Sequence, residues 1–191
     1  MTYKDIPGWF DFETFYDRMV EWAVDGARFV EIGCWLGKST AYLAQKIQAS
    51  GKRIILLAVD TWKGSPNEPL QVEQAAARNL YHEFLNNLAA CGLAFEACQG
   101  RYALAVESRR AAKLVPKAQF DFVFIDADHG YQALRADIEA WLPAVKPGGV
   151  LAGHDWCTYE SVRRAVGDTL PGCRVDGNVW WCEADLRRSN A

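Results

Sequence analysis

The chain has 191 residues, of which 50% are hydrophobic and 24% are charged, and its net charge is −3. Such a chain can bury a sizeable core in one domain, and we expect neither nucleic acid nor an anionic membrane as its partner. It has no apolar run near the roughly 20 residues of a membrane span and no signal pattern over residues 1–10, so we expect it in the cytoplasm.

Helical and strand patterns alternate along the whole chain. Apolar residues at three- and four-residue spacing predict helices over 11–23, 38–49, 70–90, 102–114, 131–141 and 159–170. Nearly continuous apolar runs predict strands over 28–32, 53–59, 93–98 and 120–125, a strand that begins at 150, and a terminal hairpin of 173–176 and 179–183. This order predicts an α/β fold with a mostly parallel sheet, helices on both faces and one antiparallel strand at the end.

Polar residues stand at the ends of four predicted strands. Ligands of parallel α/β sheets bind beyond the carboxyl ends of the strands, so these residues should meet at one site. The four strand ends are Glu31-Ile32-Gly33, Asp60-Thr61-Trp62, Asp126-Ala127-Asp128-His129 and His154-Asp155-Trp156.

A glycine turn joins the first strand to the next helix, and it would let a ligand approach bare backbone at a helix N-terminus. Gly37-Lys38-Ser39 resembles the end of a phosphate loop, but three residues separate Gly33 from Gly37 where that loop needs four. A nicotinamide-binding turn needs a glycine where Trp35 stands. The spacing therefore disfavours both of these cofactor classes.

A third interpretation fits the turn better, namely an adenosine that carries no phosphate. Asp60 ends the second strand, and its two carboxylate oxygens could accept hydrogen bonds from both ribose hydroxyls. Thr61 or Trp62 would then lie beside the adenine. The alternative is that Asp60 only caps a helix.

Three motifs together resemble the class I S-adenosylmethionine-dependent methyltransferases, and in particular their small O-methyltransferases of the catechol type and of natural-product and sugar tailoring. The resemblance implies a Rossmann-like, doubly wound sheet of seven strands with the last strand antiparallel. It also implies one methyltransferase domain over 1–191, with an N-terminal helical segment (1–27) and a lid-like insert (61–91). The motifs are Val30-Glu31-Ile32-Gly33-Cys34-Trp35-Leu36-Gly37-Lys38-Ser39-Thr40, Ala58-Val59-Asp60-Thr61-Trp62, and Phe120-Asp121-Phe122-Val123-Phe124-Ile125-Asp126-Ala127-Asp128-His129-Gly130-Tyr131.

The resemblance also implies a set of site residues. The metal-using branch holds a divalent ion at positions that correspond to Asp126, His154 and Asp155. His154 departs from the family pattern, which has a carboxylate there, so manganese, iron or zinc would suit the site at least as well as magnesium. The residues expected to bind S-adenosylmethionine are Glu31, Gly33, Gly37, Ser39, Asp60, Thr61, Trp62, Arg101 and Asp126.

His129 is the expected general base, and Asp126 is the second residue expected to take part in catalysis. His129 stands three residues after Asp126, where the metal-using branch carries a catalytic lysine, and an imidazole titrates near neutral pH. One alternative is that His129 caps the helix that begins near Tyr131, and another is that Asp155 is the N-cap of a helical turn that follows Asp155.

The predicted function is therefore methyl transfer from S-adenosylmethionine to an oxygen of a small-molecule acceptor, with a divalent metal as a candidate helper. Two alternatives stay open: a nucleoside-binding module on the same fold without catalysis, and a phosphate-loop-like nucleotide-binding protein. A homodimer is the assembly to test.

Overall fold

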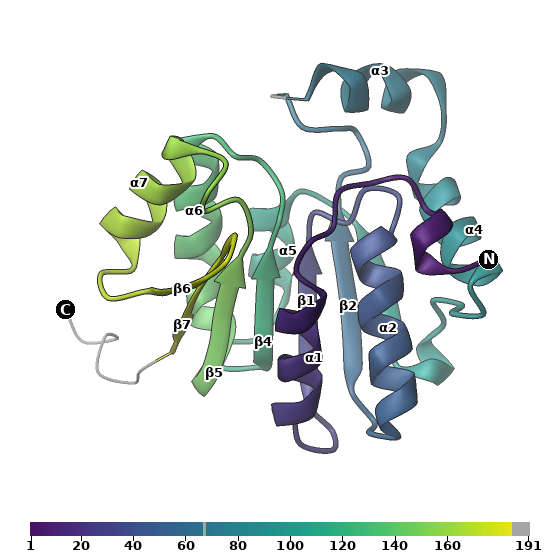
Figure 1. Ribbon diagram of the computed structural model, residues 1–191, viewed down its shortest axis with the longest axis horizontal. Coiled ribbons are helices and arrows are strands. Elements are labelled where there is room, and N and C mark those ends of the chain that lie inside the picture. Colours follow the sequence, from purple (N-terminus) through teal and green to yellow (C-terminus); the bar gives the residue numbers. More distant parts are fainter. Residues whose placement is uncertain (67, 185–191) are drawn as a thin grey trace.

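The computed structural model describes residues 1–66 and 68–184, and its centre is a seven-stranded sheet (Figure 1). The strands lie in the order β3-β2-β1-β4-β5-β7-β6; β1 to β5 are parallel, and β7 is antiparallel to both of its neighbours. The predicted fold class is confirmed, including the antiparallel strand of the terminal hairpin. The strands are β1 (Arg28–Ile32), β2 (Ile55–Asp60), β3 (Arg101–Ala105), β4 (Phe120–Ile125), β5 (Val145–Gly153), β6 (Arg174–Asp176) and β7 (Val179–Glu183).

Helices cover both faces of the sheet. Side chains of α1, α2 and α4 pack on one face, and side chains of α5, α6 and α7 pack on the other. In the part of the chain that the structure describes, no helix is long and apolar enough to cross a membrane. The helices are α1 (Glu13–Trp22), α2 (Lys38–Ser50), α3 (Pro69–Ala77), α4 (Leu80–Ala90), α5 (Ser108–Leu114), α6 (Tyr131–Trp141) and α7 (Glu160–Thr169), with short 3-10 turns at η1 (Tyr3–Asp5), η2 (Ala97–Gln99) and η3 (Leu142–Ala144).

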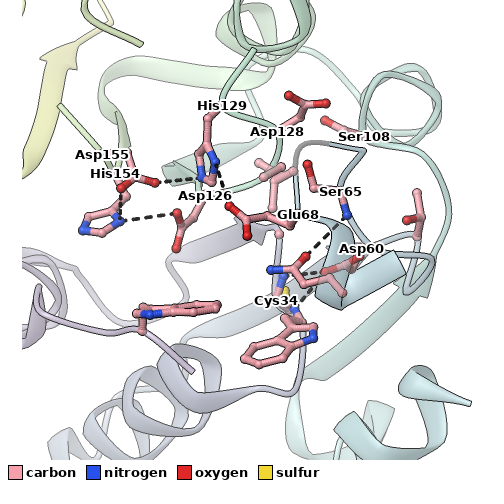
Figure 2. Close-up of a pocket in the computed structure, with 18 of the residues that line it drawn as sticks. Cys34, Asp60, Ser65, Glu68, Ser108, Asp126, Asp128, His129, His154 and Asp155 are labelled. Carbon is pink, nitrogen blue, oxygen red and sulfur yellow. Dashed lines mark hydrogen bonds and ion pairs between the residues drawn. The ribbon is translucent and has the colours of Figure 1, made fainter. Parts of the chain in front are cut away.

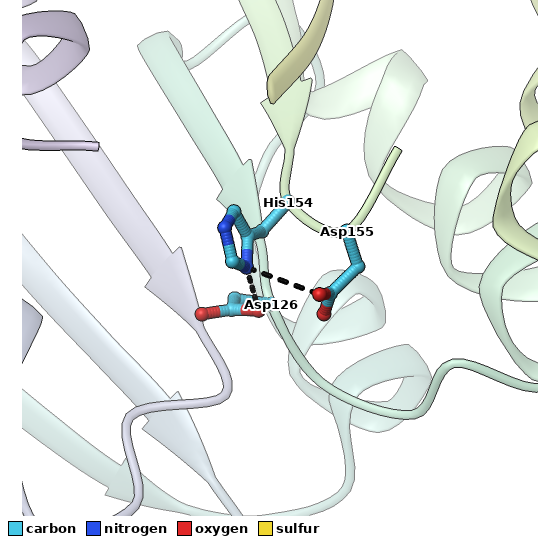
Figure 3. A group of neighbouring side chains, drawn as sticks. All are labelled: Asp126, His154 and Asp155. Atoms are coloured by element: carbon cyan, nitrogen blue, oxygen red, sulfur yellow. Dashed lines mark ion pairs between the residues drawn. The ribbon is translucent and has the colours of Figure 1, made fainter. Parts of the chain in front are cut away.

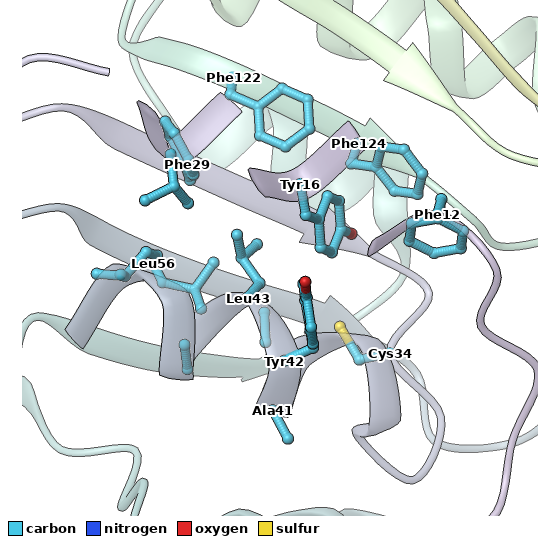
Figure 4. Packing of buried hydrophobic residues seen from close by; sticks show 14 of the residues in the cluster. Phe12, Tyr16, Phe29, Cys34, Ala41, Tyr42, Leu43, Leu56, Phe122 and Phe124 are labelled. Atoms are coloured by element: carbon cyan, nitrogen blue, oxygen red, sulfur yellow. The ribbon is translucent and has the colours of Figure 1, made fainter. Parts of the chain in front are cut away.

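Strand β4 explains why nearly continuous apolar runs predict the central strands well. Phe122 and Phe124 point to one face and pack against Tyr16 of α1, as Figure 4 shows. Val123 and Ile125 point to the other face, and all four strand residues are at most 2% exposed. A strand buried on both faces needs apolar residues at every position, which is the pattern of a parallel sheet.

The third strand lies further along the chain than predicted. Residues 93–98 form no strand; Leu93 is buried in the core, but β3 begins only at Arg101 and pairs with β2. Leu93 and Phe95 pack on the core without belonging to a strand. The helix predicted over 102–114 is accordingly shorter, because Glu107 caps the start of α5 by accepting a hydrogen bond from the Arg110 N–H at 3.0 Å.

The single helix predicted over 70–90 is also wrong, because two helices occupy this range. Asn79 interrupts the range and caps α4, since its side chain accepts a hydrogen bond from the His82 N–H at 3.1 Å. No described side chain of α3 is buried, and this helix stands beyond the carboxyl ends of the strands (Figure 1). Asn67, in the loop predicted before it, lies outside the described residues. The buried residues of α4 are Leu80, Phe84 and Leu88.

An N-terminal arm, defined here as residues 7–12, runs between η1 and α1 across the carboxyl edge of the sheet (Figure 1). Phe12 is 3% exposed and packs on Phe124 of β4, with 4.8 Å between the ring centroids. Phe10 packs on Tyr42 of α2 at 5.1 Å. These aromatic contacts fix the arm beside the strand ends that the sequence identifies as polar.

Candidate active site

A cavity of about 1010 Å³ lies at the carboxyl ends of the strands (Figure 2). The N-terminal arm, the glycine turn after β1, the loops after β2, β4 and β5, and the starts of α3 and α5 contribute to its wall. Three expected site residues lie outside the wall: Glu31, Gly37 and Arg101. The expected residues that line it are Gly33, Ser39, Asp60, Thr61, Trp62, Asp126, His129, His154 and Asp155.

Gly33 brings the glycine turn into direct contact with the end of β4. Its φ is +88°, and a Cβ atom at this position would lie 1.9 Å from the carbonyl oxygen of Asp126. The backbone ladder continues to this point, since the Asp126 N–H donates to the Ile32 carbonyl at 2.8 Å. Only glycine fits such an approach with a positive φ.

Gly37 has a different role from the one predicted for it. Its φ is +92°, and a Cβ atom there would lie 2.4 Å from Cδ2 of Leu88. Gly37 therefore lets the turn pack closely against α4 and does not form part of the cavity wall. Ser39, two residues later, does line the cavity.

Asp60 fastens the glycine turn to the end of β2. Its Oδ2 accepts hydrogen bonds from the backbone N–H groups of Cys34 and Trp35, both at 2.8 Å, and its Oδ1 accepts one from Trp62 at 2.8 Å. Trp62 is 6% exposed, and its indole N–H donates to the Trp35 carbonyl at 2.8 Å. Thr61 lines the cavity beside them. The Asp60 carboxylate thus organises the cavity wall before any ligand arrives.

Arg101 was expected at the cofactor site, but it does not lie there. It is the first residue of β3, so it lies at the end of the sheet opposite to the cavity. Its guanidinium donates to the Ala94 carbonyl at 3.0 Å and to Gln99 Oε1 at 2.5 Å. The misplaced third strand explains the error, because a strand over 93–98 would have put Arg101 just beyond a carboxyl end.

Glu31 is buried beneath the turn and is used inside the protein. Its carboxylate accepts hydrogen bonds from Tyr16 Oη at 2.9 Å and from Thr40 Oγ1 at 2.5 Å. Complete burial raises the pKa of Glu31 to about 7, although the hydrogen bonds from Thr40, Ser39 and Tyr16 act in the opposite direction. Glu31 therefore joins α1 to α2 across β1 and makes no contact with the cavity.

The raised pKa of Glu31 predicts a specific pH dependence of stability. The folded state keeps the proton between about pH 4.5 and 7 while the unfolded state loses it, so stability falls as the pH rises through this window. Glu31→Gln has no such proton, and its free energy of unfolding relative to wild type should rise by about 3 kcal/mol between pH 4 and pH 8. Urea unfolding at a series of pH values measures this difference. A difference that does not vary with pH would contradict the prediction.

Asp126, His154 and Asp155 form a compact cluster at the ends of β4 and β5 (Figure 3). One potential ligand atom from each residue lies within 4.8 Å of the others, and Nδ1 of His154 is 3.5 Å from Oδ1 of Asp126 and 3.5 Å from Oδ1 of Asp155. Burial disfavours the imidazolium, but the hydrogen bonds and charges of the two carboxylates prevail and raise the pKa of His154 to about 11. The cluster can hold a positive charge between two carboxylates.

His129 lies beside this cluster and shares Asp155 with it (Figure 2). Its Nε2 is 2.8 Å from Asp155 Oδ2, and its ring stacks on Tyr159 at 4.4 Å. Nδ1 is buried without a hydrogen bond and is 3.9 Å from Glu68 Oε1. Burial lowers the pKa of His129, but the hydrogen bond and charge of Asp155, with the charges of Asp126 and Glu68, produce a net rise.

The helix-capping alternative for His129 does not match these contacts, because the cap position of α6 is Gly130 and this helix start has no side-chain cap hydrogen bond. A turn over 156–158 does follow Asp155, whose backbone carbonyl accepts hydrogen bonds from the N–H groups of Thr158 at 3.2 Å and Tyr159 at 3.1 Å. The Asp155 carboxylate instead faces His129 and His154. Burial raises its pKa, but the hydrogen bonds and charges of these two histidines hold the pKa of Asp155 well below its usual range.

Four residues that contact the histidines could not be identified from the sequence. Asp11 and Asn178 approach His154, while Glu68 and Tyr159 approach His129. None of them ends a strand that leads into the cavity, so the rule that located the other site residues does not apply to them. Only the folded arrangement brings the N-terminal arm, the start of α3 and the β6–β7 turn to the same place.

The strand order, the glycine turn and the strand-end acids define a Rossmann-like fold with a cavity at the carboxyl edge of the sheet, where ligands of this fold class bind. A family model described as a methyltransferase domain matches residues 30–156. The chain belongs to this family, and its resemblance to the class I S-adenosylmethionine-dependent methyltransferases is confirmed.

Relatives of known structure share the fold at low sequence identity. The O-methyltransferase NovP is 17% identical with a TM-score of 0.67, over 91% of this chain and 79% of that one. An rRNA methylase from Streptococcus thermophilus is 16% identical with a TM-score of 0.60, over 90% of this chain and 95% of that one. Such identities establish the fold alone, and the fold does not select between these two kinds of acceptor.

The name of a curated relative states no activity. The uncharacterized protein y4gI of Sinorhizobium fredii is 25% identical over 130 residues. The match covers 67% of this chain but only 13% of that relative's length.

Proposed function

We propose that the chain acts as one methyltransferase domain that moves the methyl group of S-adenosylmethionine to a hydroxyl oxygen of a small molecule. The His129–Asp155 pair carries this proposal, because it lies in the same cavity as the glycine turn at Gly33. In the reaction a lone pair of the acceptor oxygen forms the new bond to the methyl carbon. The carbon–sulfur bond breaks, the sulfur keeps the electron pair, and the hydroxyl proton must go to a base.

The cofactor would lie along the glycine turn. Gly33 leaves the backbone bare for the methionine part, Ser39 lies at the start of α2, and the end of β2 presents Asp60 and Thr61 to the adenosine. Asp60 already accepts three backbone N–H groups, so the ribose would meet a carboxylate with a fixed orientation. A preorganised acceptor costs less conformational entropy when the ligand binds.

His129 would take the proton from the acceptor. In the neutral ring Nε2–H would donate to Asp155, so Nδ1 would carry the lone pair that a base needs. The acceptor hydroxyl would have to approach Nδ1 from the side of Glu68, which stands just before α3, a helix without a buried side chain. The loop after β2 together with α3 would then act as the lid over the acceptor.

A divalent metal fits the cluster by its donor set. Asp126, His154 and Asp155 offer two carboxylate oxygens and one imidazole nitrogen within 4.8 Å of one another, which suits a transition-metal ion. When bound, such an ion would lower the pKa of a hydroxyl group on the acceptor. The protein's own contribution would be to hold the three donors at the cavity wall next to His129.

The charge of the cavity wall supports a small acceptor over RNA. Its Lys and Arg side chains are few, and carboxylates outnumber them, which opposes a phosphate backbone. The net charge of the chain, −3, acts in the same direction. The basic side chains are Lys38, Lys63 and Arg109; the carboxylates are Asp11, Asp60, Glu68, Glu107, Asp126, Asp128, Asp137 and Asp155.

Calorimetric titration with S-adenosylhomocysteine tests the proposal, with ATP and NAD as control ligands. We expect a dissociation constant of micromolar order for S-adenosylhomocysteine, roughly 8 kcal/mol of binding free energy, and no measurable binding of either control. A screen of phenols, catechols and sugars for release of S-adenosylhomocysteine would then identify the acceptor. Tighter binding of ATP would favour the phosphate-loop alternative and contradict the proposal.

A further inference from the structure

The N-terminal arm places a carboxylate on the far side of His154 from the metal-ligand cluster. Oδ1 of Asp11 is 2.7 Å from Nε2 of His154. Nδ1 of the same ring faces Asp126 and Asp155 (Figure 3). The His154 side chain is only 9% exposed, so few other groups can reach it. Asp11 precedes the residues that match the family model, 30–156, so it is a feature of this chain beyond the family match.

The neighbouring amide of Asn178 competes with Asp11 for the same ring nitrogen. Asn178 Oδ1 accepts a hydrogen bond from the Cys157 N–H at 2.7 Å, which fixes the orientation of the amide. Its Nδ2 therefore faces His154 Nε2, at 3.1 Å, as a donor. A bond from Asn178 would need a lone pair on Nε2 and would place the ring proton on Nδ1, toward the metal-ligand cluster.

Asp11 favours the opposite tautomer. A carboxylate has no proton to donate, so a contact of 2.7 Å requires the proton on Nε2 of His154. In the neutral ring, the form that binds a metal after losing its second proton, the lone pair is then on Nδ1, which faces Asp126 and Asp155. Metal-binding histidines commonly donate their other N–H to a carboxylate in this way, and the partner fixes both tautomer and orientation.

We propose that Asp11 is a positioning residue for a transition-metal site formed by Asp126, His154 and Asp155, and that the imidazole ligand makes this site prefer ions such as Co²⁺ or Zn²⁺ over Mg²⁺. The inference deepens the proposed function and rests on it, since the ion would serve the same cavity. Mg²⁺ prefers oxygen donors, whereas an imidazole nitrogen suits the later divalent metals. The Asp11 side chain is 61% exposed, so the carboxylate can be removed without opening the core.

Titration of the purified protein with Co²⁺ tests the proposal, followed by calorimetry and by the visible absorption of the bound ion. Asp11→Asn should weaken Co²⁺ binding about 10- to 100-fold and change Mg²⁺ binding little. The matched control is Asp25→Asn, which removes an exposed carboxylate that pairs with Arg53 outside the cavity wall. It should leave the Co²⁺ affinity unchanged, and thermal unfolding should show that both variants are folded.

A second pair of variants distinguishes positioning of the His154 ring by Asp11 from a general effect of the negative charge of Asp11. In His154→Asp the ring is gone, so adding Asp11→Asn should cause no further loss of Co²⁺ affinity. An equal loss in both backgrounds would mean that Asp11 acts only by its charge, and it would overturn the proposal. Wild-type affinity in Asp11→Asn, or no Co²⁺ binding by the wild type, would overturn it as well. Titration of the same samples with S-adenosylhomocysteine, before any metal is added, reports on the proposed function separately.

Discussion

Replacing His129 by alanine should lower turnover by about 10²- to 10⁴-fold, the usual contribution of a general base. The affinity for S-adenosylhomocysteine should change less than about twofold, because binding free energy is lost only where contacts with that ligand are removed. The side chain of His129 contacts Asp155, Tyr159 and Glu68, and none of these three belongs to the glycine turn or to the end of β2. Single-turnover release of S-adenosylhomocysteine with an acceptor from the screen measures the loss.

The pH profile separates a base from a merely structural histidine. A base must be neutral to accept a proton, and the surrounding carboxylates raise the pKa of His129 above its ordinary value. The wild-type rate should therefore rise with pH, with a midpoint above about 6.5, and this limb should be missing in His129→Ala. His82→Ala is the matched control, since His82 is exposed on α4 and should leave rate and profile unchanged. A large loss of cofactor affinity in His129→Ala would contradict the role of base.

The central strands could be predicted from the sequence because burial on both faces leaves a signal at every position. Strands β1 and β4 and helix α6 have the predicted bounds. The edge strand β3 could not be predicted in this way, because it pairs with β2 on one side only and all of its residues after Arg101 are exposed or partly buried, such as the 42% exposed Tyr102. The more apolar run at 93–98 therefore resembled a strand more than the true strand does.

Only the site residues at the carboxyl ends of parallel strands could be predicted from the sequence. Asp60, Asp126 and His154 follow parallel strands, and parallel strands bring their carboxyl ends to one edge, so their proximity follows from the fold class. Asp11 and Asn178 reach His154 from segments 143 and 24 residues away. Their positions depend on the aromatic packing of the N-terminal arm and on the turn between β6 and β7, and no periodic pattern encodes either contact.

Replacing Gly33 by alanine should destabilise the fold by roughly 2–6 kcal/mol, the sum of a positive φ and an overpacked contact. The new Cβ would lie 1.9 Å from the carbonyl oxygen of Asp126, and backbone on both sides leaves no flexible side chain to move away. If the variant folds, the turn must shift, and affinity for S-adenosylhomocysteine should fall with it. Urea unfolding measures the first effect and calorimetry the second.

Gly51→Ala is the control that isolates the close approach at Gly33. Gly51 has a φ of +70°, but a Cβ atom there would meet nothing within 4 Å, so the change should cost about 1–2 kcal/mol from the backbone alone. Cofactor affinity should not change, because Gly51 ends α2 away from the cavity wall. If both substitutions lowered the free energy of unfolding equally, the close approach of Gly33 to Asp126 would add nothing to the cost of a positive φ. That result would contradict the close packing of Gly33 against the Asp126 carbonyl as the source of the larger loss expected for Gly33→Ala.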